Sequence, residues 1–316
     1  MKRRVGKIII LVVVALIVLL CIGIVWAGNY LYEFALTPNT GDAVADDSGK
    51  NDFPVTEEMK AAKSWFVEDG EDRYLTSYDG LKLHARFIPQ EEDRHLYAVV
   101  CHGYGSEPAG MASYAIHFYN MGFHILAPAA RGHEESEGDY IGMGWHERRD
   151  VMDWVNTIIE EDSQAQIVLY GVSMGGATVM MMSGEELPDN VKCIVEDCGY
   201  SSVWDEFAVQ LKEQFHLPTF PILNVSSLIC KIRAGYSFTE ASAVEQLKHA
   251  TLPMLFIHGE EDSFVPYSML DVVYDACASA DKEKLSIPGA SHGRASFEDP
   301  ETYWNTVAAF TEKYIE

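Results

Sequence analysis

The sequence predicts an α/β domain on a mostly parallel sheet flanked by helices, with a helical cap inserted in it and a transmembrane helix before it. Three observations predict this. Short apolar runs alternate with helical stretches from residue 96 onward, which is typical of strands buried on both faces of a parallel sheet. The insertion at about 201–250 separates two strands where one helix would suffice. A long apolar run lies near the N-terminus.

That run extends from Ile8 to Trp26 and reads IIILVVVALIVLLCIGIVW. Its 19 residues span roughly the 30 Å of a bilayer core at a rise of about 1.5 Å each. The apolar core of a cleaved signal is usually shorter, about 7–15 residues, so we expect a retained anchor rather than cleavage near Ala27. Basic residues stand at positions 2, 3, 4 and 7, and the next is Lys50. The positive-inside rule therefore predicts a single-pass protein of the cell membrane with an extracytoplasmic domain.

These features divide the chain into three parts. Residues 1–27 form a cytoplasmic tip and the transmembrane anchor, and residues 28–54, rich in Gly, Asp and Asn, are expected to be a spacer. Residues 55–316 form the α/β domain with its cap.

Each element of the domain has its own signal. A short helix is expected from Thr56 to Trp65, and two strands within Arg73–Ile88 turn at Asp79-Gly80. Apolar runs predict strands at 96–101, 123–127, 166–170, 192–196, 253–258 and 284–287. Helical spacing predicts helices at 112–121, 145–159, 175–183, 268–278 and 300–314.

Composition narrows the function. Hydrophobic residues make up 48% of the 316 residues, which excludes a disordered chain and suffices for one large core. The formal net charge of −25 repels phosphate backbones and argues against binding nucleic acid. Cys21 lies in the anchor, and the five cysteines beyond it match no zinc pattern, so we expect core residues, with a Cys193–Cys198 disulfide as the alternative.

The strongest chemical motif is Gly171-Val-Ser-Met-Gly175 between a predicted strand and a predicted helix. A sharp strand-to-helix turn lifts a serine Oγ above a sheet, and glycines fit where a Cβ would clash. This context predicts that Ser173 is a nucleophile. The alternative is a tight turn of the kind found in any parallel sheet.

A second motif, His102-Gly-Tyr-Gly105, follows a buried strand. A loop in this place can donate a backbone N–H to an oxyanion, together with the residue after the nucleophile. We therefore expect the N–H groups of Tyr104 and Met174 to form an oxyanion hole, and His102 to brace the loop. The charged stretch from His133 to residue 137 is expected to be solvated surface.

Loops after two further strands supply an acid and a base. His292 lies among small residues in Pro288-Gly-Ala-Ser-His-Gly293. Glu260, Glu261 and Asp262 compete as the acid after the preceding strand, and Asp197 is a further alternative. The order Ser173, Asp262, His292 is the one that an α/β-hydrolase requires.

With these motifs, the chain from about Arg73 to Tyr314 resembles an α/β-hydrolase of the serine esterase/peptidase-like group. It is similar to membrane-anchored or secreted hydrolases of Gram-positive bacteria that carry HGY, RGHxxSEGDYIGMGW and GVSMGG blocks. The resemblance implies a nucleophile, acid and base at Ser173, Asp262 and His292, and oxyanion donors at Tyr104 and Met174. Relatives usually read P-D-x-R-G-x-G where this chain has Pro128-Ala-Ala-Arg-Gly-His-Glu134, so an Asp and a Gly are replaced there.

The function expected is hydrolysis of small or medium carboxylic esters, a small-molecule acyl substrate, through a Ser-His-Asp triad. A peptidase or amidase using the same triad is the alternative, and a catalytically inactive binding module is a third. No HExxH, GxGxxG or P-loop pattern is present, so no metal or nucleotide cofactor is implied. No protein partner is indicated. The cap is apolar without a basic cluster, which favours neutral, apolar acyl groups; the alternative is that its apolar residues serve only to bury the cap on the core.

Overall fold

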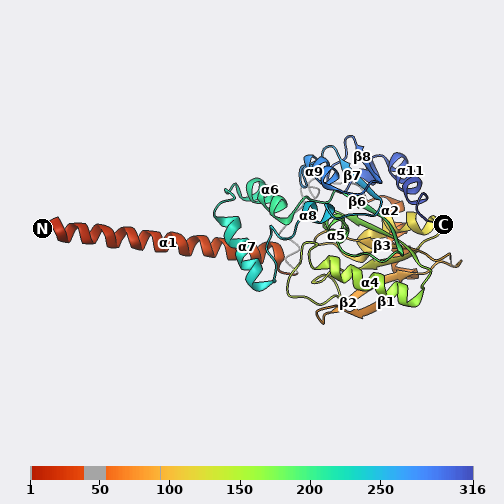
Figure 1. Ribbon diagram of the computed structural model, residues 1–316, viewed down its shortest axis with the longest axis horizontal. Coiled ribbons are helices and arrows are strands. Elements are labelled where there is room, and N and C mark those ends of the chain that lie inside the picture. The colour runs from red at the N-terminus through yellow and green to blue at the C-terminus, as the bar shows by residue number, and fades with distance from the viewer. Residues whose placement is uncertain (1, 39–54, 93, 316) are drawn as a thin grey trace.

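One sheet of eight strands forms the centre of the protein, shown by a computed structural model in Figure 1. The structure describes residues 2–38, 55–92 and 94–315. The strand order is β1-β2-β4-β3-β5-β6-β7-β8; β2 runs antiparallel to β1 and β4, and the other neighbours are parallel. The mostly parallel sheet predicted from the sequence is confirmed. The strands are β1 (Glu71–Thr76), β2 (Lys82–Ile88), β3 (Leu96–Cys101), β4 (His124–Pro128), β5 (Gln166–Val172), β6 (Val191–Asp197), β7 (Met254–Gly259) and β8 (Lys282–Ile287).

Helices cover both faces of this sheet. Alternate residues of a strand point to opposite faces, so Leu169 packs on one side and Tyr170 on the other. One face carries α4 (Glu147–Glu161), α5 (Met174–Met182) and α9 (Ser268–Ala276), and the other carries α2 (Glu57–Asp69), α3 (Ala112–Asn120) and α11 (Pro300–Thr311). These correspond to the expected helices within a few residues. A 3₁₀ turn (Pro108–Met111) and α10 (Ala295–Glu298) complete this part.

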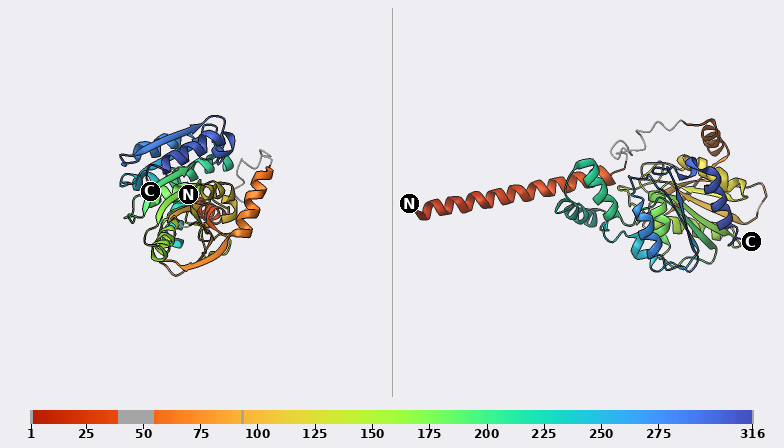
Figure 2. Two further views of the ribbon diagram at one scale, coloured as in Figure 1. Left: turned by 90° about the vertical axis from the view of Figure 1, so that its right-hand side faces the viewer. Right: turned by 90° about the horizontal axis from the view of Figure 1, so that it is seen from above.

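The N-terminal helix α1 (Lys2–Leu36) projects far from the sheet, as Figures 1 and 2 show. It is long and apolar enough to cross a membrane. Apart from the partly buried Ile24, its large apolar side chains from Ile8 to Trp26 are exposed, with Trp26 at 70%. In water such a surface would be very unfavourable, whereas in lipid it needs no protein partner.

The structure differs from the predicted spacer at its beginning. Helix α1 continues without a break to Leu36, where the sequence analysis expected a spacer from residue 28. This last part is packed, because Gly28 lies against Val225 and Ser226 of α7, and Leu36 is fully buried. A Cβ on Gly28 would stand 2.7 Å from Val225 Cγ1. The remainder of the predicted spacer, residues 39–54, lies outside the described residues.

The insertion after β6 is helical, as expected. It contains α6 (Val203–Phe215), α7 (Ile222–Arg233) and α8 (Ala243–Leu247), and Pro218 and Pro221 lie in the loop between the first two. An isolated bridge between Ser202 and Ser242 closes its base. Because α8 packs against α5 and α9, it belongs to the layer over the sheet. The cap proper is therefore α6 and α7, with the end of α1 packed on α7.

Candidate active site

Ser173 occupies the turn between β5 and α5. Its backbone has φ 58° and ψ −117°, a conformation that non-glycine residues rarely adopt. A Cβ on Gly171 would lie 2.2 Å from the Gly175 carbonyl oxygen, and a Cβ on Gly175 would lie 2.1 Å from that of Cys101. Only glycine fits at either position, and the turn holds Ser173 above the carboxyl edge of the sheet.

Three side chains from different strand ends meet at this turn. His292 Nε2 lies 2.8 Å from Ser173 Oγ, and His292 Nδ1 lies 2.8 Å from Asp262 Oδ2. A carboxylate only accepts hydrogen bonds, so Nδ1 carries the proton given to Asp262, and Nε2 accepts from the serine hydroxyl. The structure thus brings together the three residues that the sequence placed in one order.

Hydrogen bonds to both carboxylate oxygens hold the Asp262 side chain in place. Its Oδ1 accepts the backbone N–H groups of Phe264 and Val265, each at 3.0 Å, and His258 Nε2 lies 3.2 Å from its Oδ2. Burial alone would raise the pKa of the Asp262 carboxyl, but the charge of His292 and the hydrogen bonds from both histidines outweigh burial and lower this pKa. The acid therefore stays ionised, with one orientation.

The competing acids do not make this contact. Glu260 and Glu261 are exposed. Asp197 is fully buried, and its Oδ2 accepts the Tyr303 hydroxyl at 2.8 Å. Burial raises the pKa of Asp197 to about 6 although the Tyr303 hydrogen bond acts against it. The geometry therefore favours Asp262 as the partner of His292.

The loop after β3 packs directly on the nucleophile. A Cβ on Gly103 would lie 3.3 Å from Ser173 Cβ, so the loop backbone passes close to the hydroxyl. Met174 opens α5, and its N–H has no acceptor within the helix. The next residue of the loop, Tyr104, lines the open space beside Ser173.

Two histidines hold this loop in place. His102 Nδ1 donates to the Gly103 carbonyl at 2.7 Å, and its Nε2 accepts from the Ala130 N–H at 3.0 Å. Burial first, and the nearby His133 second, lower the pKa of His102 to about 3, so it is a neutral brace, as expected. His133 is also buried, and its Nε2 accepts from the Gly105 N–H at 3.2 Å. The expectation of a solvated His133 is wrong.

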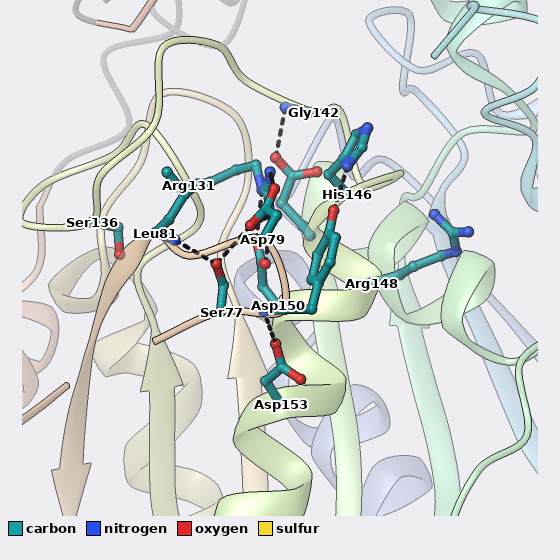
Figure 3. Close-up of polar contacts among 12 residues, drawn as sticks. Ser77, Asp79, Leu81, Arg131, Ser136, Gly142, His146, Arg148, Asp150 and Asp153 are labelled. Atoms are coloured by element: carbon teal, nitrogen blue, oxygen red, sulfur yellow. Dashed lines mark hydrogen bonds and ion pairs between the residues drawn. The ribbon is translucent and has the colours of Figure 1, made fainter. Parts of the chain in front are cut away.

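A buried arginine fixes the segment that carries these contacts. Arg131 Nε and Nη2 donate to the two carboxylate oxygens of Asp150 at 2.7 and 2.6 Å, and its Nη1 donates to Asp79 at 2.9 Å (Figure 3). Asp79 lies in the turn between β1 and β2, and Asp150 lies on α4. Arg131 therefore ties the first hairpin and a core helix to the segment after β4, which in turn contacts the loop beside the nucleophile.

The departures from the family pattern in this segment are accommodated locally. Glu134 stands at φ 47°, a conformation that favours glycine, which is the residue that the family resemblance implies at this position. Its carboxylate lies 3.0 Å from His84 Nδ1. Ala129, at the position of the missing Asp, donates its backbone N–H to the His84 carbonyl at 2.9 Å. Glu134 and Ala129 thus both contact His84 of β2.

An apolar pocket opens beside Ser173 under the cap. It holds about 720 Å³ of empty space, a figure that includes the open mouth. Its walls come from the cap, the loop after β3 and the end of α1. On the other side of Ser173 a second, more polar opening is bordered by Ser106, His292 and Arg294. The serine thus lies between an apolar and a polar space.

One acid lines the apolar pocket. Glu206 of α6 is 3% exposed; one oxygen accepts from Gln210 Nε2 at 2.8 Å, and the other has no partner among the described residues. Burial raises the pKa of Glu206 to about 8. It is therefore mainly protonated at neutral pH, and the pocket wall carries little charge. The sequence analysis did not single out this residue.

Cys198, Asp262 and His292 present possible metal-ligand atoms within 4.8 Å of one another. The histidine and the carboxylate already hydrogen-bond to each other, and burial raises the pKa of the Cys198 thiol well above its usual value. A protonated thiol is a poor metal ligand, so the group fits the serine site better than a metal centre. All six cysteines are free, which excludes the alternative Cys193–Cys198 disulfide.

Comparison with known proteins agrees with this geometry. The sequence profile of the prolyl oligopeptidase family matches residues 111–316. The YqkD protein of Bacillus subtilis is 24% identical over 294 residues, and the match covers 93% of either chain. A membrane protein of Saccharomyces cerevisiae, YNL320W, is 22% identical over 238 residues, which cover 75% of this chain and 77% of that one.

The fold also matches solved structures. The esterase Pf2001 of Pyrococcus furiosus superimposes with a TM-score of 0.63 at 21% sequence identity, and the match covers 80% of this chain and 95% of the esterase. The protein therefore has the α/β-hydrolase fold that the motifs implied.

The buried carboxyl group gives a pH-dependent test of the pocket. The raised pKa of Glu206 means that folding favours its protonated form, so its stabilising contribution is complete below about pH 4.5 and is lost as the pH rises through about 8. Glu206→Gln keeps the shape without a charge. We expect this variant to melt several degrees above the wild type at pH 8, and close to it at pH 5.

Glu213→Gln is the matched control, because Glu213 lies on the same helix and is exposed. It should change the melting temperature little at either pH. An equal gain for Glu206→Gln at both pH values would show that Glu206 is not held in its protonated form.

Proposed function

The chain belongs to the prolyl oligopeptidase family, and on this premise we propose that it is a serine hydrolase that cleaves carboxylic esters through an acyl-enzyme intermediate. One observation carries the proposal: the series of hydrogen bonds from Asp262 through His292 to Ser173, beside an apolar pocket. In this proposal Ser173 is the nucleophile, His292 the base and Asp262 the orienting acid.

The proposed reaction has two halves. Ser173 Oγ attacks the ester carbonyl while His292 Nε2 takes the hydroxyl proton, and Asp262 stabilises the resulting imidazolium. The backbone N–H groups of Tyr104 and Met174 bind the oxyanion of the tetrahedral intermediate. The alkoxide leaves with the proton from His292, and the acyl group remains on Ser173. Water, activated by the same histidine, then releases the carboxylic acid and restores the serine.

A peptidase or amidase is the alternative, and the family match is the observation that supports it. Attack on an amide requires stronger protonation of the leaving nitrogen, but it uses the same three residues. The neutral, apolar wall around Glu206 favours an acyl chain without charge. Turnover of a panel of p-nitrophenyl esters and aminoacyl amides by one preparation would separate the two activities.

We further propose that residues 1–27 anchor the enzyme in the cell membrane, with the domain on the extracytoplasmic side. The apolar length of α1 and the basic residues before it support this topology. The relative YNL320W, described as a membrane protein, adds support. The packing of Gly28 against α7 gives the end of the helix a place in the domain, which favours a retained anchor over a removed signal.

The nucleophile can be tested directly. Ser173→Ala should lower ester turnover by roughly 10³- to 10⁶-fold, because only oxyanion binding and substrate positioning remain. It should also abolish labelling by a fluorophosphonate probe, with an unchanged circular dichroism spectrum. Labelling retained in this variant would refute Ser173 as the nucleophile. Absence of labelling in the wild type would favour an inactive binding module.

The choice of acid has a matched pair of variants. Asp262→Asn should lower kcat by about 10⁴-fold, as the corresponding change does in a serine protease, because the imidazole would adopt the wrong tautomer. Asp197→Asn changes a buried acid of the neighbouring strand and should have a mild effect on kcat. If Asp197→Asn is the crippling change, the acid is misassigned.

The topology is tested in cells. Full-length protein should sediment with membranes and resist carbonate extraction, and protease added outside wall-free cells should remove the domain. A mainly soluble, secreted form beginning near Gly28 would contradict a retained anchor.

A further inference from the structure

The last two turns of α1 form part of the wall of the pocket beside Ser173. Leu31, Phe34 and Ala35 all line it. The Phe34 ring meets Phe215 of α6 edge to face, with centroids 5.3 Å apart. The anchor helix therefore continues beyond its contact with α7 and reaches the pocket.

A hydrogen bond joins this helix to the loop after β3. The Tyr104 hydroxyl donates to the Ala35 carbonyl at 2.9 Å. The last residue of α1 is also held, because the Ile141 N–H donates to the Leu36 carbonyl at 2.8 Å. The position of α1 is thus coupled to the backbone that borders the nucleophile.

Helix geometry places the pocket wall at the membrane surface. The apolar run ends at Trp26, and Leu31 lies five residues later, a distance of about 7.5 Å along the axis. The polar layer on each side of a bilayer is roughly 5–8 Å thick. If the run fills the hydrocarbon core, the pocket wall begins at the outer limit of the headgroups. The interfacial residues Trp26 and Tyr30 precede it, as aromatic belts do.

The cap has an apolar surface beside the same helix. Phe220 is 76% exposed, Ile232 75% and Leu228 59%, and the last two lie on α7, which packs along α1. Apolar side chains of this size, gathered next to a membrane span, are typical of a surface that rests in the headgroup region. The bilayer is therefore the occupant that we assign to this surface.

We propose that the substrate is an acyl ester of a bilayer lipid, whose acyl chain passes along the end of α1 into the apolar pocket. This rests on the proposed esterase function and specifies its substrate class. The ester carbonyl lies at Ser173, and the alcohol part occupies the polar opening near Ser106 and Arg294. The acyl group transfers to Ser173 Oγ, the alcohol leaves with the proton from His292, and water then releases the fatty acid.

The test uses the full-length chain in vesicles of a diether phosphatidylcholine that contains monooleoylglycerol, so that only the added lipid has an ester. Wild type should release oleate. Leu31→Trp fills the pocket from the α1 side, and the loss of activity that it causes should grow with the length of the acyl chain. It should be small for p-nitrophenyl acetate and roughly tenfold or more for the decanoate and for monooleoylglycerol, because each excluded methylene costs several-fold. Leu20→Trp makes the same change on the exposed part of α1 and should behave as wild type.

A second pair of variants tests entry from the membrane. Ile232→Glu places a charge on the exposed apolar surface of the cap and should slow oleate release from vesicles several-fold, while soluble p-nitrophenyl decanoate is hydrolysed as before. Val272→Glu is the control, because Val272 is an exposed apolar residue of α9 outside the cap.

The outcomes separate this proposal from the one that it rests on. Equal losses on acetate and oleoyl substrates in Leu31→Trp, or no loss on either, would overturn the role of α1 in the acyl path. Unchanged oleate release in Ile232→Glu would overturn entry from the bilayer. In both cases fluorophosphonate labelling and acetate hydrolysis by the wild type would leave the serine esterase intact. Absence of labelling in the wild type would instead refute the proposed function.

Discussion

The sharp turn at Ser173 is the constraint on which the site depends. A residue at φ 58° outside glycine costs of order 1–3 kcal/mol, and the surrounding backbone must impose it. The cause here is steric: Gly171 lies so close to Gly175, and Gly175 so close to Cys101 at the end of β3, that neither position has room for a Cβ. The turn also sets the position of the hydroxyl, which hydrogen-bonds to His292 and borders the pocket. The strand packing therefore fixes the direction of the proposed attack before any substrate binds.

The sequence predicted those features that depend on strand ends. Parallel neighbours place their carboxyl ends at one edge, so residues just after β5, β7 and β8 had to meet, and Ser173, Asp262 and His292 do. Among three adjacent acids, only the family resemblance selected Asp262. The physical reason lies in the loop backbone, whose Phe264 and Val265 N–H groups donate to the Asp262 carboxylate. Composition alone does not carry that information.

The features missed by the sequence analysis depend on packing between distant segments. Residues 28–36 were assigned to a spacer from composition, although Tyr32 and Leu36, four residues apart, lie on one helical face and are buried in the domain. Glu206 follows Val203 by one helical turn, so helical spacing could have placed it on the inner face. His133 Nδ1 donates to the carbonyl of the buried Arg131, and the charge of Arg131 is balanced by Asp79 and Asp150, which lie 52 and 19 positions away. Neither partner is adjacent in the sequence.

The continuity of α1 changes how the membrane and the site are related. A flexible spacer between span and domain would let the pocket take any height above the bilayer, since the distance between its ends fluctuates. A continuous helix instead fixes that height at about 1.5 Å per residue, from the apolar run to the pocket wall. In the proposed topology, the depth of the anchor in the bilayer sets the distance of Ser173 from the lipid, and a bilayer of different thickness would move the serine relative to the headgroups.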